Sequence, residues 1–464
     1  PVDVEIGAAV TTALKPGPNK LNAAAAPETL RLRPGRNAGS ISVRLKDPVR
    51  WEPGNPFLYY ATLYLLQDGR PLTARSERFG FTIRNGKFHR NGRRIYLFGE
   101  NLRSVNFGGL GDEEANRKHL IDKLQGFKSL GYNIIRNAHM PALPELYRYA
   151  DEIGLMIYDE WGWCFTNFID EPEFSKRNPV ELEEWLVRDY NHPSVVLWSC
   201  GNEVVHRNAP PVAREMDRQV ERIRSLDKQK RPISTFSGAG GWRSYGETKL
   251  DTDVRDLHTY TALSSPWTKL PEELAEIVEG DRRIYGEKER LSRPLVSWEN
   301  VGFSWGIYPD PKFRAGFLQD YLEYASRPTN WANPNGIGFT GCVPLFKAVG
   351  SDFWLWAQAR YGRRIFELYR LNPHFTGFAP WFSNPGLAAA TLWNQPLLPS
   401  LHTDNLLFPG NLFSGRATPW TLTVHNAGNR ACRNLTCDVE MVAEKDGKIT
   451  PAASFEMDGP AAQQ

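Results

Sequence analysis

The sequence predicts an eight-stranded α/β barrel (a TIM barrel) flanked on both sides by β-sandwich domains. Three observations lead to this fold class. Short strand-like runs occupy the first part of the chain, strands and helices then alternate through the middle, and the helical pattern stops after about residue 400. Eight strand–helix units favour a barrel over a doubly wound sheet, which usually has fewer strands and a Gly-rich phosphate loop.

The N-terminal segment, residues 1–82, is predicted to form a small antiparallel sandwich. Alternating runs such as "SISVRL" and "YYATLYLL" are separated by the turn-like stretches "DPVRWEPGNP" and "QDGRP". Apolar and polar residues that alternate between turn signals are typical of strands with one buried face. The chain begins within such a strand, so we expect this domain to be truncated at its N-terminus.

Residues 83–400 are predicted to form the barrel. Its first strand is the apolar run Ile95–Phe98, and the helix that follows has Leu120, Leu124 and Phe127 at helical spacing before a terminating Gly131. The next seven strands are predicted at "NIIRNA", "LMIYDEW", "SVVLWS", "RPISTF", "DLHTYT", "RPLVSWE" and "FTGFAPWF". Helices are predicted between them at residues 143–154, 179–190 and 210–226.

The last segment, residues 401–464, returns to a β pattern. The stretch "TPWTLTVHNAGNRACRNLTCDVEMVAEKDGKI" is predicted to be a strand, a turn and another strand. We expect it to be the truncated start of a C-terminal sandwich.

Composition excludes several classes of protein. Nothing approaches the ~18 apolar residues of a membrane-spanning helix, and the first residues lack the pattern of a signal peptide. The formal charge of +3 is near balance, with no basic and aromatic stretch of the kind that binds nucleic acid. The five cysteines lack metal-site spacing. We therefore expect a soluble protein with no nucleic-acid or membrane partner; export and a homo-oligomeric state stay open.

Catalytic residues of a TIM barrel lie at the C-terminal ends of its strands. In this chain those ends carry carboxylates, an amide, a histidine and aromatic rings. The candidates by strand are Glu160 and Trp161 (third), Asn202 and Glu203 (fourth), His258 and Tyr260 (sixth), Glu299 (seventh) and Trp381 (eighth).

Two of these carboxylates suit the cleavage of a glycosidic bond with retention. That reaction needs an acid to protonate the leaving oxygen and a carboxylate about 5 to 5.5 Å away to attack the anomeric carbon. Glu203 is the candidate acid, and Glu299 is the candidate nucleophile, kept ionised by donors such as Tyr260 or Arg136. Asn202 is placed to bond the sugar 2-hydroxyl.

The same stretches resemble a known family. "NHPSVVLWSCGNE" is similar to the acid/base signature of glycoside hydrolase family 2, which contains β-galactosidases, β-glucuronidases and β-mannosidases. "WEPGNPFLYYATLYL" with "RFGFTI" resembles the end of that family's immunoglobulin-like domain, and "NIIRNAHMPALPELYRYADEIGLMIYDEWG" resembles its second and third barrel strands. The resemblance covers roughly residues 40 to 390.

The resemblance implies Glu203 as acid/base with Asn202 beside it, and Glu299 as nucleophile. It further implies a set of groups that line the pocket or form subsites: Arg136, His139, Glu160, His258, Tyr260 and Trp381. Two stretches depart from the family pattern. The first strand ends "GENLRS", which leaves the role of Glu100 and Asn101 open, and the nucleophile stretch is "SWEN" where Glu-Tyr is commoner.

The function expected is that of a retaining exo-β-glycosidase, β-galactosidase-like, that acts on an oligosaccharide or glycoconjugate without a cofactor or metal. Glucuronide or mannoside specificity is the alternative; a uronate would require a cationic clamp, for which Arg103, Arg243 and Lys347 are candidates. Glu160 could contact substrate, support a divalent ion or pair with Arg136. The rival from another class is a non-catalytic carbohydrate-binding relative, against which the retention of both carboxylates argues.

Overall fold

The structure of the chain is a computed structural model. It describes residues 2–12, 21–82, 88–90, 93–103, 112–164, 171–204, 210–238, 251–258, 270–299, 363, 365–380, 388–402, 417, 419–428, 431–443 and 445–458. The predicted site residues Tyr260 and Trp381 lie outside these ranges, as do Arg243 and Lys347.

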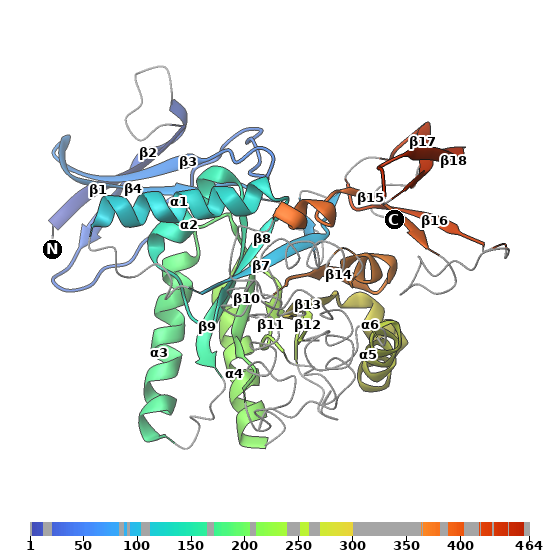
Figure 1. Ribbon diagram of the computed structural model, residues 1–464. Helices are drawn as coiled ribbons and strands as arrows, with labels where there is room; N and C mark the ends of the chain where they lie inside the picture. The colour runs from blue at the N-terminus through green and yellow to red at the C-terminus, as the bar shows by residue number, and fades with distance from the viewer. Residues whose placement is uncertain are drawn as a thin grey trace. The chain divides into compact units, whose positions relative to one another are not determined.

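The N-terminal segment forms a four-stranded antiparallel sheet in the order β2-β1-β3-β4 (Figure 1). Its strands are β1 (Val2–Thr11), β2 (Leu21–Leu32), β3 (Tyr59–Gln67) and β4 (Arg70–Phe79). This confirms antiparallel strands in this segment. The strand predicted at "SISVRL" is wrong: residues 41–45 alternate between half-buried and exposed but are assigned to no strand, because alternation records which side faces the protein, whereas a strand also needs a paired neighbour.

The middle of the chain forms an eight-stranded sheet in the order β11-β10-β9-β8-β7-β14-β13-β12. The ladders β8-β9, β9-β10, β12-β13, β13-β14 and β14-β7 are parallel. The strands are β7 (Leu97–Arg103), β8 (Ile134–Ala138), β9 (Met156–Cys164), β10 (Val195–Asn202), β11 (Ile233–Ser234), β12 (Arg255–His258), β13 (Leu295–Glu299) and β14 (Phe375–Phe378). This order is that of a near-closed TIM-like barrel whose ladder is open between β11 and β12, and all eight predicted strands are present.

Barrel strands are buried along their length rather than on alternate residues. Every residue of β8, β12, β13 and β14 is buried, as are the first five of β9. Strands that are covered on both faces are expected to be apolar without alternation. This explains why runs such as "NIIRNA" and "LVSWE" could be recognised from sequence.

The helices between the strands are α1 (Glu113–Ser129), α2 (Pro144–Ile153), α3 (Pro172–Asp189), α4 (Pro210–Leu226), α5 (Leu270–Tyr285) and α6 (Glu287–Ser292). Helix α2 starts with Pro at its first position and ends at Gly154, whose φ of 73° suits glycine. The predicted start of α3 at Pro179 is wrong, because the helix begins at Pro172 and continues through Pro179. Residues 365–371, before the eighth strand, are also helical.

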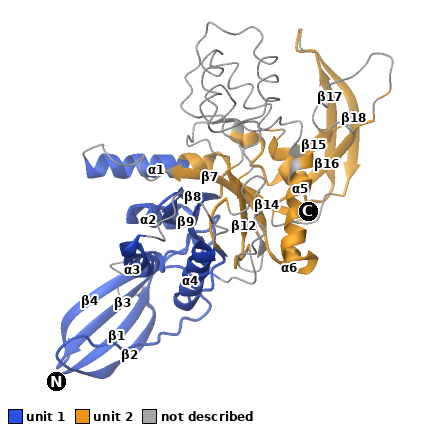
Figure 2. Cartoon of the chain, turned by 90° about the horizontal axis from the view of Figure 1, so that it is seen from below, with its two compact units in different colours: residues 1–85, 103–125, 134–233 blue, residues 86–102, 126–133, 234–464 orange. Residues whose placement is uncertain are grey.

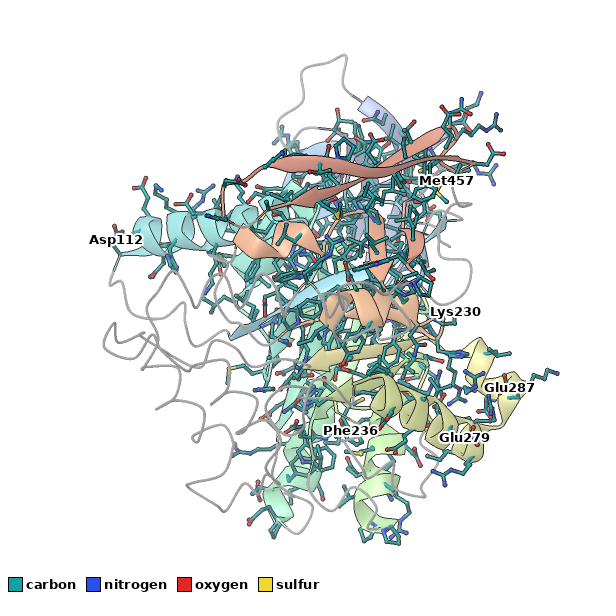
Figure 3. The ribbon with its side chains drawn as sticks, turned by 45° about the vertical axis from the view of Figure 1, so that its right-hand side comes forward. Asp112, Lys230, Phe236, Glu279, Glu287 and Met457 are labelled. Atoms are coloured by element: carbon teal, nitrogen blue, oxygen red, sulfur yellow. The ribbon has the colours of Figure 1, made fainter. Side chains whose placement is uncertain are left out.

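Smaller elements complete the described part of the chain. They are β5 (His89–Arg90), β6 (Arg93–Arg94), the 3₁₀ helix η3 (Ala388–Leu392), β15 (Leu397–His402), β16 (Thr421–Asn426), β17 (Leu435–Val442) and β18 (Ile449–Met457). Antiparallel pairs β15-β16 and β17-β18 confirm the predicted return to strands. Arg282 of α5 donates to Glu279 of the same helix at 2.6 Å and to Glu287 of α6 at 2.8 Å. Both acids are labelled in Figure 3.

The chain divides into two compact units, coloured in Figure 2. Unit 1 comprises residues 1–85, 103–125 and 134–233, and unit 2 comprises residues 86–102, 126–133 and 234–464. In the described part of the chain, the helices are all too short or too polar to cross a membrane.

Candidate active site

In unit 1, Arg136 on β8 organises the ends of three neighbouring strands. Its Nε and Nη2 donate to the two carboxylate oxygens of Glu160 on β9, both at 2.8 Å, and Nη2 also donates to Asn202 Oδ1 on β10 at 2.6 Å. All three side chains are fully buried. Buried ion pairs of this kind require good geometry, and the loss of one partner typically costs about 3–5 kcal/mol. Of the three alternatives for Glu160, pairing with Arg136 is therefore the one observed.

Two further groups complete this cluster. Ser199 Oγ on β10 donates to Glu160 Oε2 at 3.2 Å. His139, just after β8, lies with Nδ1 at 3.3 Å from Arg136 Nη2 and 3.5 Å from Glu160 Oε1. A guanidinium only donates, so the first contact requires Nδ1 to accept. Unlike Arg136 and Glu160, His139 keeps part of its side chain exposed.

Asn202 is held at both ends of its amide. Its Oδ1 accepts from Arg136, and its Nδ2 donates to Cys164 Sγ at 3.6 Å. Gly201, the residue before Asn202, allows β10 to pack closely against β9, because a Cβ there would overlap the Trp163 carbonyl oxygen on β9. Burial raises the pKa of the Cys164 thiol to about 12, so the sulfur stays protonated and serves as a weak acceptor.

Glu203 follows directly after the last residue of β10. Its φ is 42°, in the left-handed region that residues other than glycine rarely adopt. Glu203 is half-buried, whereas Asn202 is fully buried. A backbone conformation of this kind costs of order 1–3 kcal/mol and persists where the surrounding structure enforces it, often at functional sites.

In unit 2, Glu299 ends β13 and is almost fully buried, paired in register with His258 at the end of β12. His258 Nε2 lies 3.6 Å from Glu299 Oε1 and 2.9 Å from Ser237 Oγ. Ser237 Oγ donates to Asp256 Oδ2 at 2.5 Å, and Asp256 Oδ1 accepts from the Trp298 backbone amide at 3.2 Å. The nucleophile candidate is therefore backed by a line of polar groups.

The structure resolves the role of the "GENLRS" stretch. Asn101 Nδ2 donates to the carbonyl oxygens of Trp298 at 2.7 Å and Pro380 at 3.1 Å, so it ties the ends of β13 and β14 to β7. Glu100 accepts from the Asn101 backbone amide and from Tyr132, and burial, with the Glu100 charge adding to it, raises the pKa of Tyr132 well above its usual value. Glu100 and Asn101, which both lie on β7, are fully buried.

Trp161 is engaged away from the strand-end cluster. Its indole Nε1 donates to Asn178 on α3 at 2.8 Å, and its ring lies 5.4 Å from that of Trp185.

Among the residues not singled out from sequence, Cys164, Ser199 and Ser237 contact predicted site residues, and Asp256 contacts Ser237. Cys164 entered only as one of five cysteines, and the two serines belong to a residue type that is common everywhere. Asp256 did carry a signal, since it is an acid inside a short buried strand, and such an acid needs partners. Its partner Ser237, however, is brought near only by the fold.

Two family models match adjacent segments of the chain. One, for the glycosyl hydrolases family 2, matches residues 3–81, and the other, for the TIM barrel domain of that family, matches residues 81–301. Together they span more than half of the chain. The chain belongs to glycoside hydrolase family 2.

Relatives of this family 2 chain have two kinds of name. A β-galactosidase of Aeromonas hydrophila is 31% identical over 300 residues, covering 60% of this chain and 27% of that protein. A β-glucuronidase of Streptococcus agalactiae is 31% identical over 209 residues, covering 41% of this chain and 34% of that protein.

Among solved structures, a β-glucuronidase of Bifidobacterium dentium complexed with coumarin-3-O-glucuronide matches with a TM-score of 0.59 and 19% identity. The match covers 82% of this chain and 54% of that one. A family 2 member from Bacteroides cellulosilyticus matches 99% of this chain and 56% of its own length, with a TM-score of 0.58 and 15% identity. The family 2 chain thus spans about a fifth to a third of the curated relatives and just over half of these structures.

Proposed function

We propose that the chain carries the catalytic barrel of a retaining exo-β-glycosidase, in which Glu203 is the acid/base and Glu299 the nucleophile. The observation that carries this proposal is that Glu203 directly follows β10 and Glu299 ends β13, the fourth and seventh strands of the barrel in chain order. Membership of family 2 supports the class of reaction, which proceeds through a covalent glycosyl-enzyme and needs no cofactor.

The other predicted groups are assigned by what they contact. Arg136 and Glu160 hold Asn202, so we propose that they position this amide beside the acid/base rather than touch the sugar. Asn202, His139 and His258 are proposed substrate groups, with Trp161, Tyr260 and Trp381 as further predicted ones. The antiparallel sheets at 1–82 and 401–464 are proposed to belong to immunoglobulin-like sandwiches on either side of the barrel at 83–400.

A β-galactoside is the proposed substrate class from sequence, and a β-glucuronide is the second candidate. Relatives named for both activities support keeping both. A glucuronide would require a cationic partner for its carboxylate. Arg103, the last residue of β7, is the candidate clamp that ends a barrel strand.

The experiment uses 2-deoxy-2-fluoro β-glycosides of galactose, glucose, mannose and glucuronic acid, with intact and peptide mass measurement. The fluorine slows turnover of the glycosyl-enzyme, so a productive sugar remains on the nucleophile. We expect one sugar to label Glu299 and the Glu299→Gln variant to stay unlabelled. Glu173→Gln, which changes an exposed glutamate on α3, is the matched control and should label normally.

Each outcome has a distinct meaning. A label on another carboxylate would contradict the assignment of Glu299 as the nucleophile but would still support a retaining glycosidase. Absence of a label with all four sugars, repeated in a chain extended to the full length of its relatives, would favour the carbohydrate-binding alternative.

A further inference from the structure

A line of buried hydrogen-bonding groups leads from the core of unit 2 to the proposed nucleophile. Asp256, Ser237 and His258 are at most 1% exposed, and Glu299 is 3% exposed. The contacts run from Asp256 Oδ2 to Ser237 Oγ at 2.5 Å, from Ser237 Oγ to His258 Nε2 at 2.9 Å, and from Nε2 to Glu299 Oε1 at 3.6 Å. Asp256 is also tied to β13 by the Trp298 backbone amide, one residue before Glu299.

The inventory of donors decides the direction of this line. A serine hydroxyl has one proton, and that of Ser237 is donated to the Asp256 carboxylate. Only the oxygen lone pairs of Ser237 remain for His258. The 2.9 Å contact is therefore a hydrogen bond in which His258 Nε2–H donates.

We propose that Asp256 and Ser237 are positioning residues that fix the proton of His258 on Nε2, the ring nitrogen that faces Glu299. The inference rests on the proposed role of Glu299 for its catalytic meaning. With its proton on Nε2 and donated to Ser237, the ring has a positively polarised N–H edge, not a lone pair, beside the Glu299 carboxylate, 3.6 Å from Nε2 to Oε1. This edge favours the ionised, nucleophilic form of Glu299. With the proton on Nδ1 alone, an Nε2 lone pair would face the carboxylate and repel it.

A single substitution should reverse the line. Asp256 accepts at both oxygens, from Trp298 at one and Ser237 at the other. An Asp256→Asn side chain has one acceptor and one donor, so when its oxygen keeps the Trp298 amide, its NH₂ group faces Ser237. Ser237 must then donate to His258 Nε2, which moves the histidine proton to Nδ1.

The tautomer can be measured directly by ¹⁵N NMR of the full chain labelled at its histidines. A protonated and an unprotonated ring nitrogen resonate in separate ranges, and His258→Asn identifies the signals by their loss. We expect a protonated Nε2 in the unchanged protein and an unprotonated Nε2 in Asp256→Asn. Ser234→Ala is the matched control: Ser234 is a buried serine of the same segment that donates to the Phe236 carbonyl, so its loss should leave the tautomer unchanged.

An unprotonated Nε2 in the unchanged protein would overturn the proposal without any variant. A protonated Nε2 that persists in both Asp256→Asn and Ser237→Ala would also overturn it, since another group would then set the tautomer. Asp256→Asn should slow fluoroglycoside labelling about 10²-fold, the scale of a misoriented catalytic group. Labelling at normal rate with a switched tautomer would refute the catalytic consequence, whereas labelling of another carboxylate would refute the proposed role of Glu299 and leave the tautomer result standing.

Discussion

At the scale of single residues, Glu203 combines a carboxylate side chain with a backbone conformation that residues other than glycine rarely adopt. Its φ of 42° follows a strand whose last residue, Asn202, is held by Arg136 and Cys164. Those contacts fix the end of β10 and so supply the surrounding structure that a left-handed glutamate needs. The contacts of Asn202 therefore help to hold the Glu203 backbone in a strained conformation.

Replacing this acid with alanine gives a prediction that separates the two steps of retention. In Glu203→Ala, hydrolysis of substrates with poor leaving groups should fall about 10²- to 10⁴-fold, because no group protonates the leaving oxygen. Dinitrophenyl glycosides need no such proton, so they should still glycosylate the enzyme. Added azide, which needs no general base, should then release a β-glycosyl azide detectable by mass.

Glu160→Gln is the informative comparison for that variant. It removes a nearby buried carboxylate that we assign to positioning, so azide should give no glycosyl azide with it. If azide gave a glycosyl azide with Glu160→Gln but not with Glu203→Ala, Glu160 and not Glu203 would be the acid/base.

At the scale of the element, β9 sends two adjacent acids to opposite faces. Glu160 faces Arg136 and Ser199 on the neighbouring strands β8 and β10. Asp159 instead faces the helices, where it accepts from Tyr147 of α2 at 2.7 Å and Trp185 of α3 at 3.1 Å. The two-residue period of a strand explains why the pair "DE" performs two unrelated tasks.

Burial and the nearby Asp189 charge raise the pKa of Asp159 well above its usual value. The native state therefore holds this proton to a higher pH than the unfolded chain, and the contribution of Asp159 to stability falls as pH rises above 3.8. Asp159→Asn removes that titration and sets an NH₂ group against the Trp185 donor, at a cost of about 1–3 kcal/mol. Melting curves should show the advantage of the unchanged protein over this variant shrinking from acid to neutral pH; an advantage that grows with pH would contradict the assignment.

At the scale of the whole molecule, the chain supplies the proposed chemistry with its own side chains. Both oxygens of Glu160, the carboxylate that was the open metal candidate, are taken by the Arg136 guanidinium. We expect exhaustive dialysis against EDTA to leave the rate of fluoroglycoside labelling unchanged, compared with protein dialysed against buffer alone. A loss that returns on adding Mg²⁺ or Mn²⁺ would show that a cation takes part.

The sequence by itself determined the alternation of strands and helices, because strands covered on both faces must be continuously apolar and helices must repeat every three to four residues. It also identified strand-end groups such as Asn202, Glu203 and Glu299, since the polar end of a buried strand is conspicuous in one dimension. Two predictions from sequence were wrong. The alternating pattern at "SISVRL" predicted a strand, but these residues are assigned to no strand. The helix-start signal at Pro179 predicted the wrong start, because α3 begins at Pro172 and continues through Pro179.

Only the tertiary structure decided which polar groups work together. Pairing of Glu160 with Arg136, which lie on different strands, was one of three alternatives that the sequence left open. The contact of Ser237, which lies after β11, with His258 on β12 is not predicted by any spacing in the sequence. Tertiary structure also separated Asp159 from Glu160 and assigned Asn101 to the joining of strand ends. The physical reason is that burial is encoded locally by residue type, whereas hydrogen-bond partnership depends on which strands the fold makes neighbours.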